Sequence, residues 1–207
     1  MDGRKYAPAT QRNREPILKV LLEILPPMGT ILEIASGTGE HAAYFAPSLK
    51  PRKWIPSDTS ISLRESIAAW VKHSKSENLY QPLDIDASQP IWKVEKEILA
   101  EISDISAIVN INMIHISPWS ACLGLIAAAG RILSQGGILY LYGPYKQCGE
   151  HTAPSNVAFN EYLKQQNPEW GIRNLEDVIE VASGHNLTLQ KTYPMPANNL
   201  SVIFKHS

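Results

Sequence analysis

The segment from Ile31 to His41 constrains the fold of this chain more than any other part of the sequence. Its letters are ILEIASGTGEH: a short apolar run, a turn that contains Gly37 and Gly39, and residues that can begin a helix. An apolar, partly β-branched run is typical of a parallel strand that is covered on both faces. Glycines keep Cβ atoms away from a ligand at the turn, and the free N–H groups of the helix start point into it. The pattern therefore predicts a nucleotide site at the end of a buried strand.

The overall composition is that of an ordinary globular chain. Its 207 residues include 19 basic and 20 acidic ones, so the formal net charge is -1, and 44% of the residues are hydrophobic. This balance argues against an electrostatic surface for nucleic acid or for anionic membranes. No apolar run reaches the ~18 residues that span a bilayer, and residues 1–14 lack the apolar core of a signal peptide. We therefore expect a cytoplasmic protein without nucleic-acid or membrane partners.

Apolar runs and helical periodicities alternate along the chain. Strands are predicted at about residues 30–35, 53–57, 79–83, 106–112, 138–142, 187–193 and 200–205. Helices are predicted at about residues 16–25, 39–48, 60–73, 91–102, 118–133, 155–166 and 174–184. Strands that alternate with helices form parallel sheets, and the short connection between the last two strands requires antiparallel pairing. The expected fold is α/β: a Rossmann-like, doubly wound sheet of about seven strands, mostly parallel, with a C-terminal antiparallel strand pair.

An acidic residue follows the second predicted strand, where a ribose would lie. Residues 37–42 fit the dinucleotide pattern G-x-G-x-x-A, and Asp58 comes nineteen residues after Gly39. A carboxylate at this place can accept two hydrogen bonds from a vicinal diol. Alternatively, Asp58 caps the helix that begins near Ser60, and the two roles are compatible. The sequence thus predicts a nucleoside-bearing cofactor.

These motifs resemble the first three motifs of class I S-adenosylmethionine-dependent methyltransferases. The matching residues are Glu33, Ala35, Gly37, Gly39, Asp58 and Asp84. The resemblance implies that S-adenosyl-L-methionine is the cofactor. It also implies that Glu33 orders the glycine loop, that Asp58 binds the ribose, and that Asp84 and Ile85 lie beside the adenine. The terminal antiparallel pair extends the resemblance.

Ala35 departs from the family pattern, because a glycine usually stands at this position. Alanine keeps the turn where φ is negative and is strained where φ is positive. Ser36 in the same turn and Asn110 at the end of the fourth strand border the same crevice, and we include both among the cofactor contacts. Arg12 is included as a partner for the methionine carboxylate, the alternative being a solvated first helical turn.

Three longer stretches resemble a small family of uncharacterised methyltransferase-like proteins. Their sequences are YAPATQRNREPI at 6–17, NMIHISPW at 112–119 and NPEWGIR at 167–173. This likeness spans nearly the whole chain and implies the fold rather than the substrate. We expect a single methyltransferase-like domain over residues 1–207, in which residues 1–28 form an arm and a helix that cover the cofactor site.

Two side chains are candidates for catalysis at the same edge of the sheet. His115 follows the fourth strand, where it can position an acceptor or take its proton as a general base. Alternatively, His115 caps the next helix or bonds the loop backbone. Tyr145 lies in a polar loop after the fifth strand, which is either part of an acceptor pocket or a solvated surface loop. The predicted substrate pocket contains Asn112, Met113, His151 and Asn156.

The leading functional hypothesis is methyl transfer to a small-molecule or protein acceptor, in an oligomeric state that the sequence leaves open. One alternative is a non-catalytic cofactor-binding or scaffold protein on the same fold. Another is an NAD-dependent oxidoreductase, against which stand Glu33, Asp84 and the lack of a clear Tyr-x-x-x-Lys pair. The two cysteines, Cys122 and Cys148, have no metal-ligand spacing, so no metal is expected.

Overall fold

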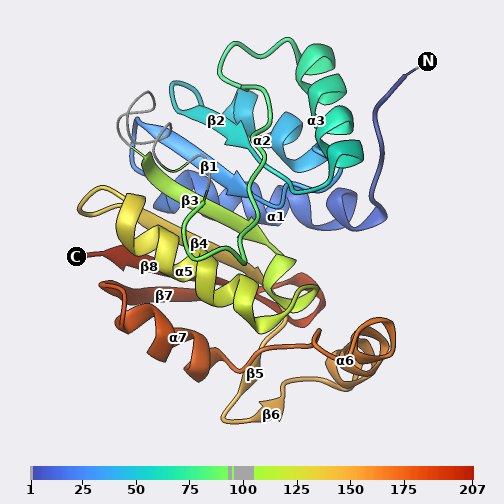
Figure 1. The fold of residues 1–207 in the computed structure, drawn as a ribbon, viewed down its shortest axis with the longest axis vertical. Coiled ribbons are helices and arrows are strands. Elements are labelled where there is room, and N and C mark those ends of the chain that lie inside the picture. The colour runs from blue at the N-terminus through green and yellow to red at the C-terminus, as the bar shows by residue number, and fades with distance from the viewer. Residues whose placement is uncertain (1, 93–94, 96–104) are drawn as a thin grey trace.

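A twisted sheet runs through the molecule with helices on both of its faces (Figure 1). The computed structural model describes residues 2–92, 95 and 105–207, and within them the main sheet has six strands in the order β2-β1-β3-β4-β8-β7. These strands are β1 Thr30–Ile34, β2 Lys53–Pro56, β3 Ile105–Ile111, β4 Ile138–Gly143, β7 Leu187–Met195 and β8 Asn199–His206. The first four are parallel, and β8 pairs antiparallel with both β4 and β7. The predicted α/β fold with a C-terminal antiparallel pair is confirmed.

The helices occupy most of the predicted positions. They are α1 Pro8–Ile24, α2 Glu40–Ser48, α3 Ile61–Ser74, α5 Trp119–Ile132, α6 Pro154–Gln166 and α7 Leu175–Ser183. Two short 3-10 turns, η1 Met113–His115 and η2 Pro196–Asn198, and a small hairpin of β5 Lys146–Gln147 with β6 Glu150–His151 complete the elements used below. The helix expected at 91–102 lies outside the described residues, apart from residues 91, 92 and 95.

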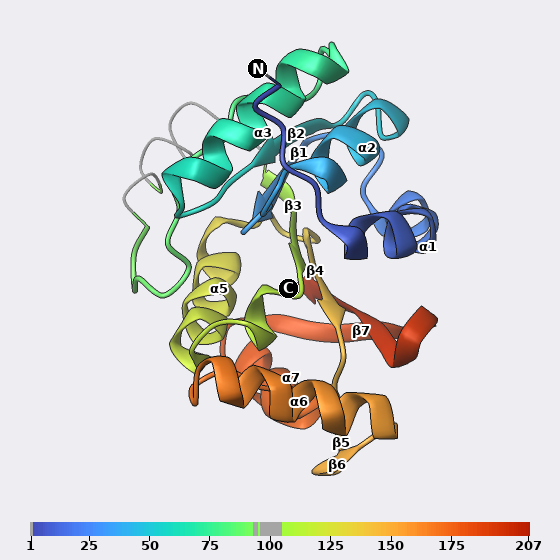
Figure 2. The same ribbon diagram turned by 90° about the vertical axis from the view of Figure 1, so that its right-hand side faces the viewer.

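The central strands lie between two helical layers (Figure 2), and the core clusters show that alternate residues of these strands face different layers. Ile31 packs with buried side chains of α1 and α2, whereas Leu32 packs with those of α5 and α7. Every residue of β1, β3 and β4 is buried, as is typical of strands covered on both faces. This burial explains why the sequence shows continuous apolar runs rather than strict alternation.

The expected strand at 79–83 is wrong, which is why the sheet has six strands rather than about seven. The segment runs beside β2 and makes two isolated parallel bridges, Trp54 with Leu79 and Ser57 with Leu83. The backbone N–H of Leu83 still donates to the carbonyl of Pro56 over 3.0 Å. Pro56 and Pro82 have no N–H, so the ladder between the two bridges is interrupted.

Helix α1 begins eight residues before the predicted start at Pro16. Pro8 occupies its first turn, where the missing N–H costs no hydrogen bond. The buried positions Thr10, Asn13 and Ile17 follow one helical face straight through Pro16. Because two of these buried residues are polar, the apolar pattern does not reveal the first two turns of the helix.

Candidate functional site

The glycine turn joins β1 to α2 at the carboxyl edge of the sheet, as predicted. Gly37 has φ 58° and Gly39 has φ 90°, which are conformations that glycine adopts without strain. A Cβ atom on Gly39 would lie 2.9 Å from Cα of Ile67 in α3, so this glycine allows the two helices to pack closely. A Cβ atom on Gly37 would meet no described heavy atom within 4 Å. Gly37 therefore borders open space in which a ligand can lie against the backbone.

The residues between β1 and Gly37 are held firmly against the end of β2. The backbone N–H of Ser36 donates to the carbonyl of Ser57 over 2.7 Å, and the N–H of Ser57 donates to Oγ of Ser36 over 3.1 Å. Ala35 has φ 55°, so it adopts the strained alternative considered above. A left-handed conformation costs a residue with a Cβ atom about 1–2 kcal/mol. The turn keeps its shape despite this strain because β2 holds it.

Asp58 reaches the glycine turn from the end of β2. Its Oδ2 accepts a hydrogen bond from the N–H of Gly37 over 3.0 Å, and its Oδ1 accepts one from the N–H of Ser60 over 2.9 Å. The cap of α3 is Ser60, whose Oγ accepts from the N–H of Leu63, so Asp58 is not the helix cap. A carboxylate offers about four lone pairs, so both oxygens keep the capacity to accept further hydrogen bonds.

Glu33 lies inside the molecule, between β1 and β2. Only 1% of its surface is exposed, and its Oε2 accepts a hydrogen bond from Nε1 of Trp54 over 3.0 Å. Burial raises the pKa of Glu33 to about 7, although the hydrogen bond from Trp54 acts in the opposite direction. Glu33 therefore braces the two strands whose ends carry the turn and Asp58.

Asp84 and Ile85 follow the interrupted segment beside β2. Asp84 is exposed, and its Oδ1 accepts a hydrogen bond from Nη1 of Arg64 over 2.9 Å. The same Nη1 atom donates to the backbone carbonyl of Asp58 over 2.8 Å. Arg64 thus links two of the acidic motif residues at one edge of the sheet. Ile85 is 1% exposed and belongs to the core.

Asn110 connects the end of β3 to the end of β1. Its side chain is buried, and Nδ2 donates to the carbonyl of Ile34 over 2.9 Å. Its Oδ1 is buried without a hydrogen-bond partner among the described residues. Asn112, two residues further on, has φ 66° and donates its N–H to the carbonyl of Tyr142 in β4. The ends of β1, β3 and β4 are thereby fixed relative to one another.

His115 and Tyr145 have almost no exposed surface, 0% and 1%. Their rings meet edge to face at 5.0 Å, and Nδ1 of His115 accepts from the backbone N–H of Arg173 over 3.4 Å. Burial lowers the pKa of His115 to about 3, with the Arg173 charge acting in the same direction, and burial raises the pKa of Tyr145 far above its usual value. This geometry favours the alternative in which His115 bonds a loop backbone. The catalytic roles stay predictions.

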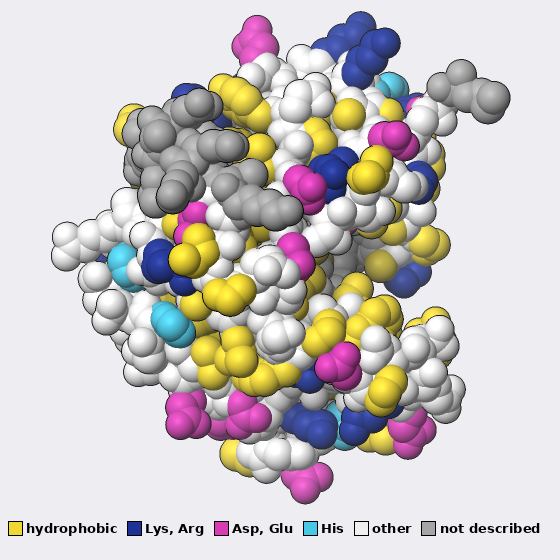
Figure 3. All heavy atoms as spheres, in the orientation of Figure 1, with side chains coloured by type: hydrophobic (Ala, Val, Ile, Leu, Met, Phe, Trp, Pro, Cys, Tyr) yellow, Lys and Arg dark blue, Asp and Glu magenta, His cyan; other side chains and the backbone are white. Residues whose placement is uncertain are grey.

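A groove with a volume of about 530 Å³ lies beyond the ends of β3 and β4. We call it the β3–β4 groove; its lining includes Arg12, Asn112, Ile116, Tyr142, Asn156 and Phe159. Its walls come from α1, from the strand ends, from α6 and from the connection between β7 and β8. Figure 3 shows the molecule hollowed between the part that carries α1 and the part that carries α6. The groove adjoins the end of β3, which Asn110 ties to Ile34, the last residue of β1 before the glycine turn.

A family model described as "Protein of unknown function (DUF938)" matches residues 4–206. The chain belongs to the DUF938 family. An O-methyltransferase family protein from Burkholderia thailandensis is 13% identical with a TM-score of 0.77, and the alignment covers 96% of this chain and 57% of that one. An O-methyltransferase family 2 protein from Planctomyces limnophilus, in complex with apigenin, is 17% identical with a TM-score of 0.76, covering 96% and 58%. The chain thus spans little more than half the length of these proteins.

A third solved structure is closer to this chain in length. It is magnesium protoporphyrin IX methyltransferase (ChlM) from Synechocystis PCC 6803 with bound SAH, at 10% identity and a TM-score of 0.69, covering 96% of this chain and 84% of that one. At such identities these likenesses establish the fold. The predicted resemblance to class I methyltransferases and to a family of unknown function is confirmed.

The predicted pocket residues of this DUF938 chain fall into three places. Asn112 and Asn156 line the β3–β4 groove. Met113 is 8% exposed and packs in the core. His151 lies in β6 and lines a separate surface depression with the start of α6. The structure therefore brings Asn112 and Asn156 together in one groove and places Met113 and His151 elsewhere, and the role of all four in a substrate pocket stays a prediction.

Sequence reasoning missed several residues of the groove. Phe159, Ile116 and Asn199 line it, but none of them was among the predicted site residues. Phe159 is 38% exposed and Ile116 is 43% exposed, and large apolar side chains on a concave surface are typical of ligand sites. The spacing of Asn156 and Phe159, three residues apart on one helix, was the available signal, since such positions share a helical face.

Within the described part of the chain, no cluster of three or more His, Cys, Asp or Glu side chains is placed to hold a metal ion. The helices described there are all too short or too polar to cross a bilayer.

Proposed function

We propose that this protein transfers the methyl group of S-adenosylmethionine to an acceptor bound in the β3–β4 groove. One observation carries the proposal: the Asp58 carboxylate lies 3.0 Å from the N–H of Gly37, beside the open space at the end of β1. This arrangement places a carboxylate, which can accept hydrogen bonds from the two ribose hydroxyls, next to the backbone of the turn. A bound nucleoside requires both. The fold, which it shares with O-methyltransferase family proteins, supports the same reading.

The side chains around the turn fit this cofactor. Asp58 would accept from the ribose hydroxyls, and the exposed carboxylate of Asp84 would accept from the adenine amino group beside the backbone of Ile85. Oδ1 of Asn110, which is buried and has no hydrogen-bond partner among the described residues, offers a further acceptor at the end of β3. Glu33 and Ser36 support the turn, since Glu33 accepts a hydrogen bond from Trp54 in β2 and Ser36 accepts one from Ser57, the residue after β2. Bound S-adenosylmethionine supplies a methyl group on a sulfonium, which is already a good leaving group.

The contribution of the protein itself is to align the acceptor and to exclude water. The β3–β4 groove begins at Asn112, two residues after Asn110, so an acceptor held there faces the cofactor side of the sheet edge. A general base is needed only where the acceptor loses a proton as it attacks. Since His115 and Tyr145 are buried, we assign both to holding the loops in place, through Arg173 and the edge-to-face contact.

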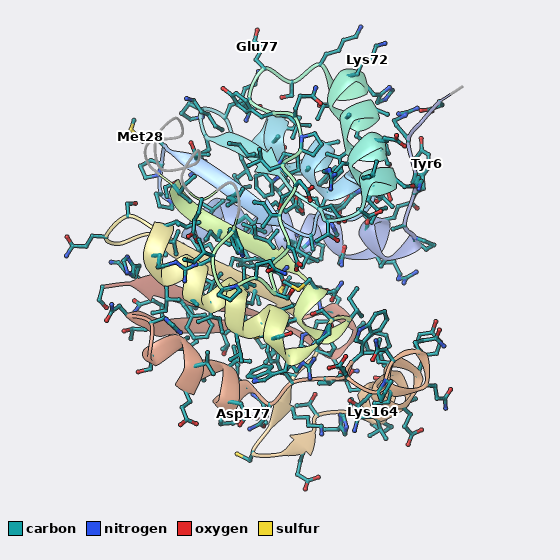
Figure 4. The ribbon with its side chains drawn as sticks, viewed as in Figure 1. Tyr6, Met28, Lys72, Glu77, Lys164 and Asp177 are labelled. Atoms are coloured by element: carbon teal, nitrogen blue, oxygen red, sulfur yellow. The ribbon has the colours of Figure 1, made fainter. Side chains whose placement is uncertain are left out.

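We further propose that residues 1–28 cover the cofactor within a single domain of residues 1–207. The arm at residues 2–7 lies along α3, with Tyr6 on its outer side (Figure 4). The N–H of Lys5 donates to Oγ of Ser66 over 2.8 Å, and the N–H of Ala7 donates to the carboxylate of Glu40 beside the glycine turn. Bound S-adenosylhomocysteine should slow proteolysis of this arm. Equal cleavage with and without it would contradict the covering role.

The decisive experiment is calorimetric titration with S-adenosylhomocysteine, with NAD as the parallel ligand. We expect micromolar binding of the first alone. Asp58→Ala should weaken it roughly 10- to 100-fold, because a hydrogen bond to a charged group is worth about 1.5–3 kcal/mol. Asp177→Ala, a change in an exposed carboxylate on α7, is the matched control and should bind like wild type.

Each other outcome changes the assignment. Unchanged binding by Asp58→Ala would show that Asp58 does not hold the ribose. Binding of NAD alone would replace the proposal with the oxidoreductase. Binding of neither ligand would leave the fold without its cofactor and favour the scaffold alternative.

A further inference from the structure

We propose that the β3–β4 groove takes an apolar small molecule bearing one carboxylate, and that Arg12 binds this carboxylate. The inference deepens the proposed function and rests on it, because the groove is proposed to hold the methyl acceptor. It differs from the expectation that Arg12 binds the methionine carboxylate. Three features of the groove carry it: its charge, its apolar wall and its fixed frame.

The described lining of the groove carries positive charge only. Arg12 is the only charged side chain among the described residues that line the groove, and no carboxylate from the described part of the chain faces it. Arg12 is exposed and forms no ion pair with any described residue. A guanidinium presents a planar fork that matches a carboxylate with two parallel hydrogen bonds. A cationic ligand would meet repulsion here, and a single arginine suits a single negative charge.

The apolar wall of the groove indicates that the rest of the ligand, apart from its carboxylate, is apolar. Phe159 on α6 and Ile116 after η1 expose 38% and 43% of their surfaces, and Pro144 and the largely buried Tyr142 complete this side. An apolar, concave lining with a few polar groups is what small-molecule sites show, and a volume of about 530 Å³ falls in the range of about 300–1,000 Å³ typical of them. A flat apolar body therefore fits between α6 and the ends of β3 and β4.

The polar frame around the wall is already fixed by internal hydrogen bonds. Nδ2 of Asn156 donates to Oγ1 of Thr152 and to the carbonyl of Asn198, each over 3.1 Å. Oδ1 of Asn13 lies 2.8 Å from Nε2 of His41. These amides hold α6 to the β7–β8 connection and α1 to α2. The groove is thus preformed, which lowers the ordering cost of binding.

The test uses three probes that share one ring system and differ in charge: indole-3-acetate, indole-3-ethanol and tryptamine. Each is titrated into the full chain, and S-adenosylhomocysteine is titrated separately into the same preparations. We expect indole-3-acetate to bind at least fivefold more tightly than the alcohol, and tryptamine to bind most weakly. Arg12→Gln should remove the preference for the acid, whereas Phe159→Ala should weaken the acid and the alcohol by similar factors. Lys19→Gln, an exposed change on the same helix, is the matched control and should alter neither.

Three results would overturn the inference. One is equal binding of the three probes, and another is no binding of any probe at millimolar concentration. The third is an Arg12→Gln variant that loses affinity for S-adenosylhomocysteine and keeps its preference for the acid. That result would show that Arg12 binds the cofactor, as first expected. If S-adenosylhomocysteine binds and the acid preference is absent, the inference fails and the proposed function stands. If the acid preference is present and S-adenosylhomocysteine does not bind, the proposed function fails instead.

Discussion

The glycine turn and the β3–β4 groove lie at the same edge of the sheet but are built differently. The turn is fixed by contacts between two chain segments 21 residues apart, such as the bond from Gly37 to Asp58. The groove gathers side chains from α1, β3, β4, α6 and the β7–β8 connection, so Arg12 and Asn199 face the same space. The turn presents backbone atoms, whereas the groove presents mainly side chains.

This difference separates two requirements on the protein. A backbone turn that is packed against a neighbouring helix loses stability when a Cβ atom is added at the packed position, as at Gly39. Substitution of exposed side chains in a groove costs the fold less stability, and its main effect is on the affinity for the ligand. Substitutions in the turn should therefore change both stability and cofactor affinity. Substitutions in the groove should change acceptor affinity with a smaller effect on stability.

The strongest test compares Gly39→Ala with Phe159→Ala. The first places a Cβ atom 2.9 Å from Cα of Ile67 at φ 90°, so we expect a loss of about 3 kcal/mol, the sum of left-handed strain and overpacking. The second removes a side chain that is 38% exposed, and we expect a smaller loss of about 1–2 kcal/mol, because full burial of a phenylalanine side chain contributes only about 1.5–3 kcal/mol. Urea unfolding followed by circular dichroism measures both. Equal losses in the free energy of unfolding would contradict the proposal that the turn contributes more to stability than the groove does.

The next test concerns the buried Glu33 behind the turn. Its pKa, raised by burial from 4.5 to about 7, means that the folded state holds the proton more tightly than the unfolded state. The stabilisation is complete below pH 4.5 and is lost as the pH rises to 7, by up to about 3 kcal/mol. Glu33→Gln should remove this loss and be more stable than wild type at pH 8. Urea unfolding across pH 4–8 measures the difference.

Wild type must be compared with Glu33→Gln at each pH, because other groups titrate in the same range. Burial lowers the pKa values of His41 and His115, which adds a slope of opposite sign that both proteins share. Asp84→Asn, a change in an exposed carboxylate, is the control and should follow wild type. A constant difference between wild type and Glu33→Gln from pH 4 to 8 would show that folding does not raise the pKa of Glu33.

The smallest effect is expected at Ala35. Glycine relieves the left-handed strain at φ 55°, but it also adds conformational freedom to the unfolded chain. We expect Ala35→Gly to raise the free energy of unfolding by about 0.5 kcal/mol, because the relief of strain is larger than the effect of the added freedom in the unfolded chain. The measurement is again urea unfolding. A loss of stability would show that the turn relaxes locally and stores no strain.

Sequence spacing predicted the turn because strand, glycines and Asp58 are close along the chain and follow one geometric pattern. It did not predict Phe159, because this side chain faces the groove only through the packing of α6 against the β7–β8 connection. His115 shows the same limit. A histidine after a strand can be exposed or buried, and here the outcome is set by Tyr145 and by Arg173, 58 residues away.

The prolines at the two sides of the sheet have a consequence for association between chains. At one side, Pro56 and Pro82 interrupt the pairing of the segment beside β2. At the other, β7 carries a register shift between Leu189 and Lys191 and ends near Pro194. Among the described residues, the row of backbone donors and acceptors is broken at both sides, and such breaks are one way in which natural sheets avoid edge-to-edge aggregation. We therefore expect that joining of two copies into one continuous sheet is disfavoured at both of these sides.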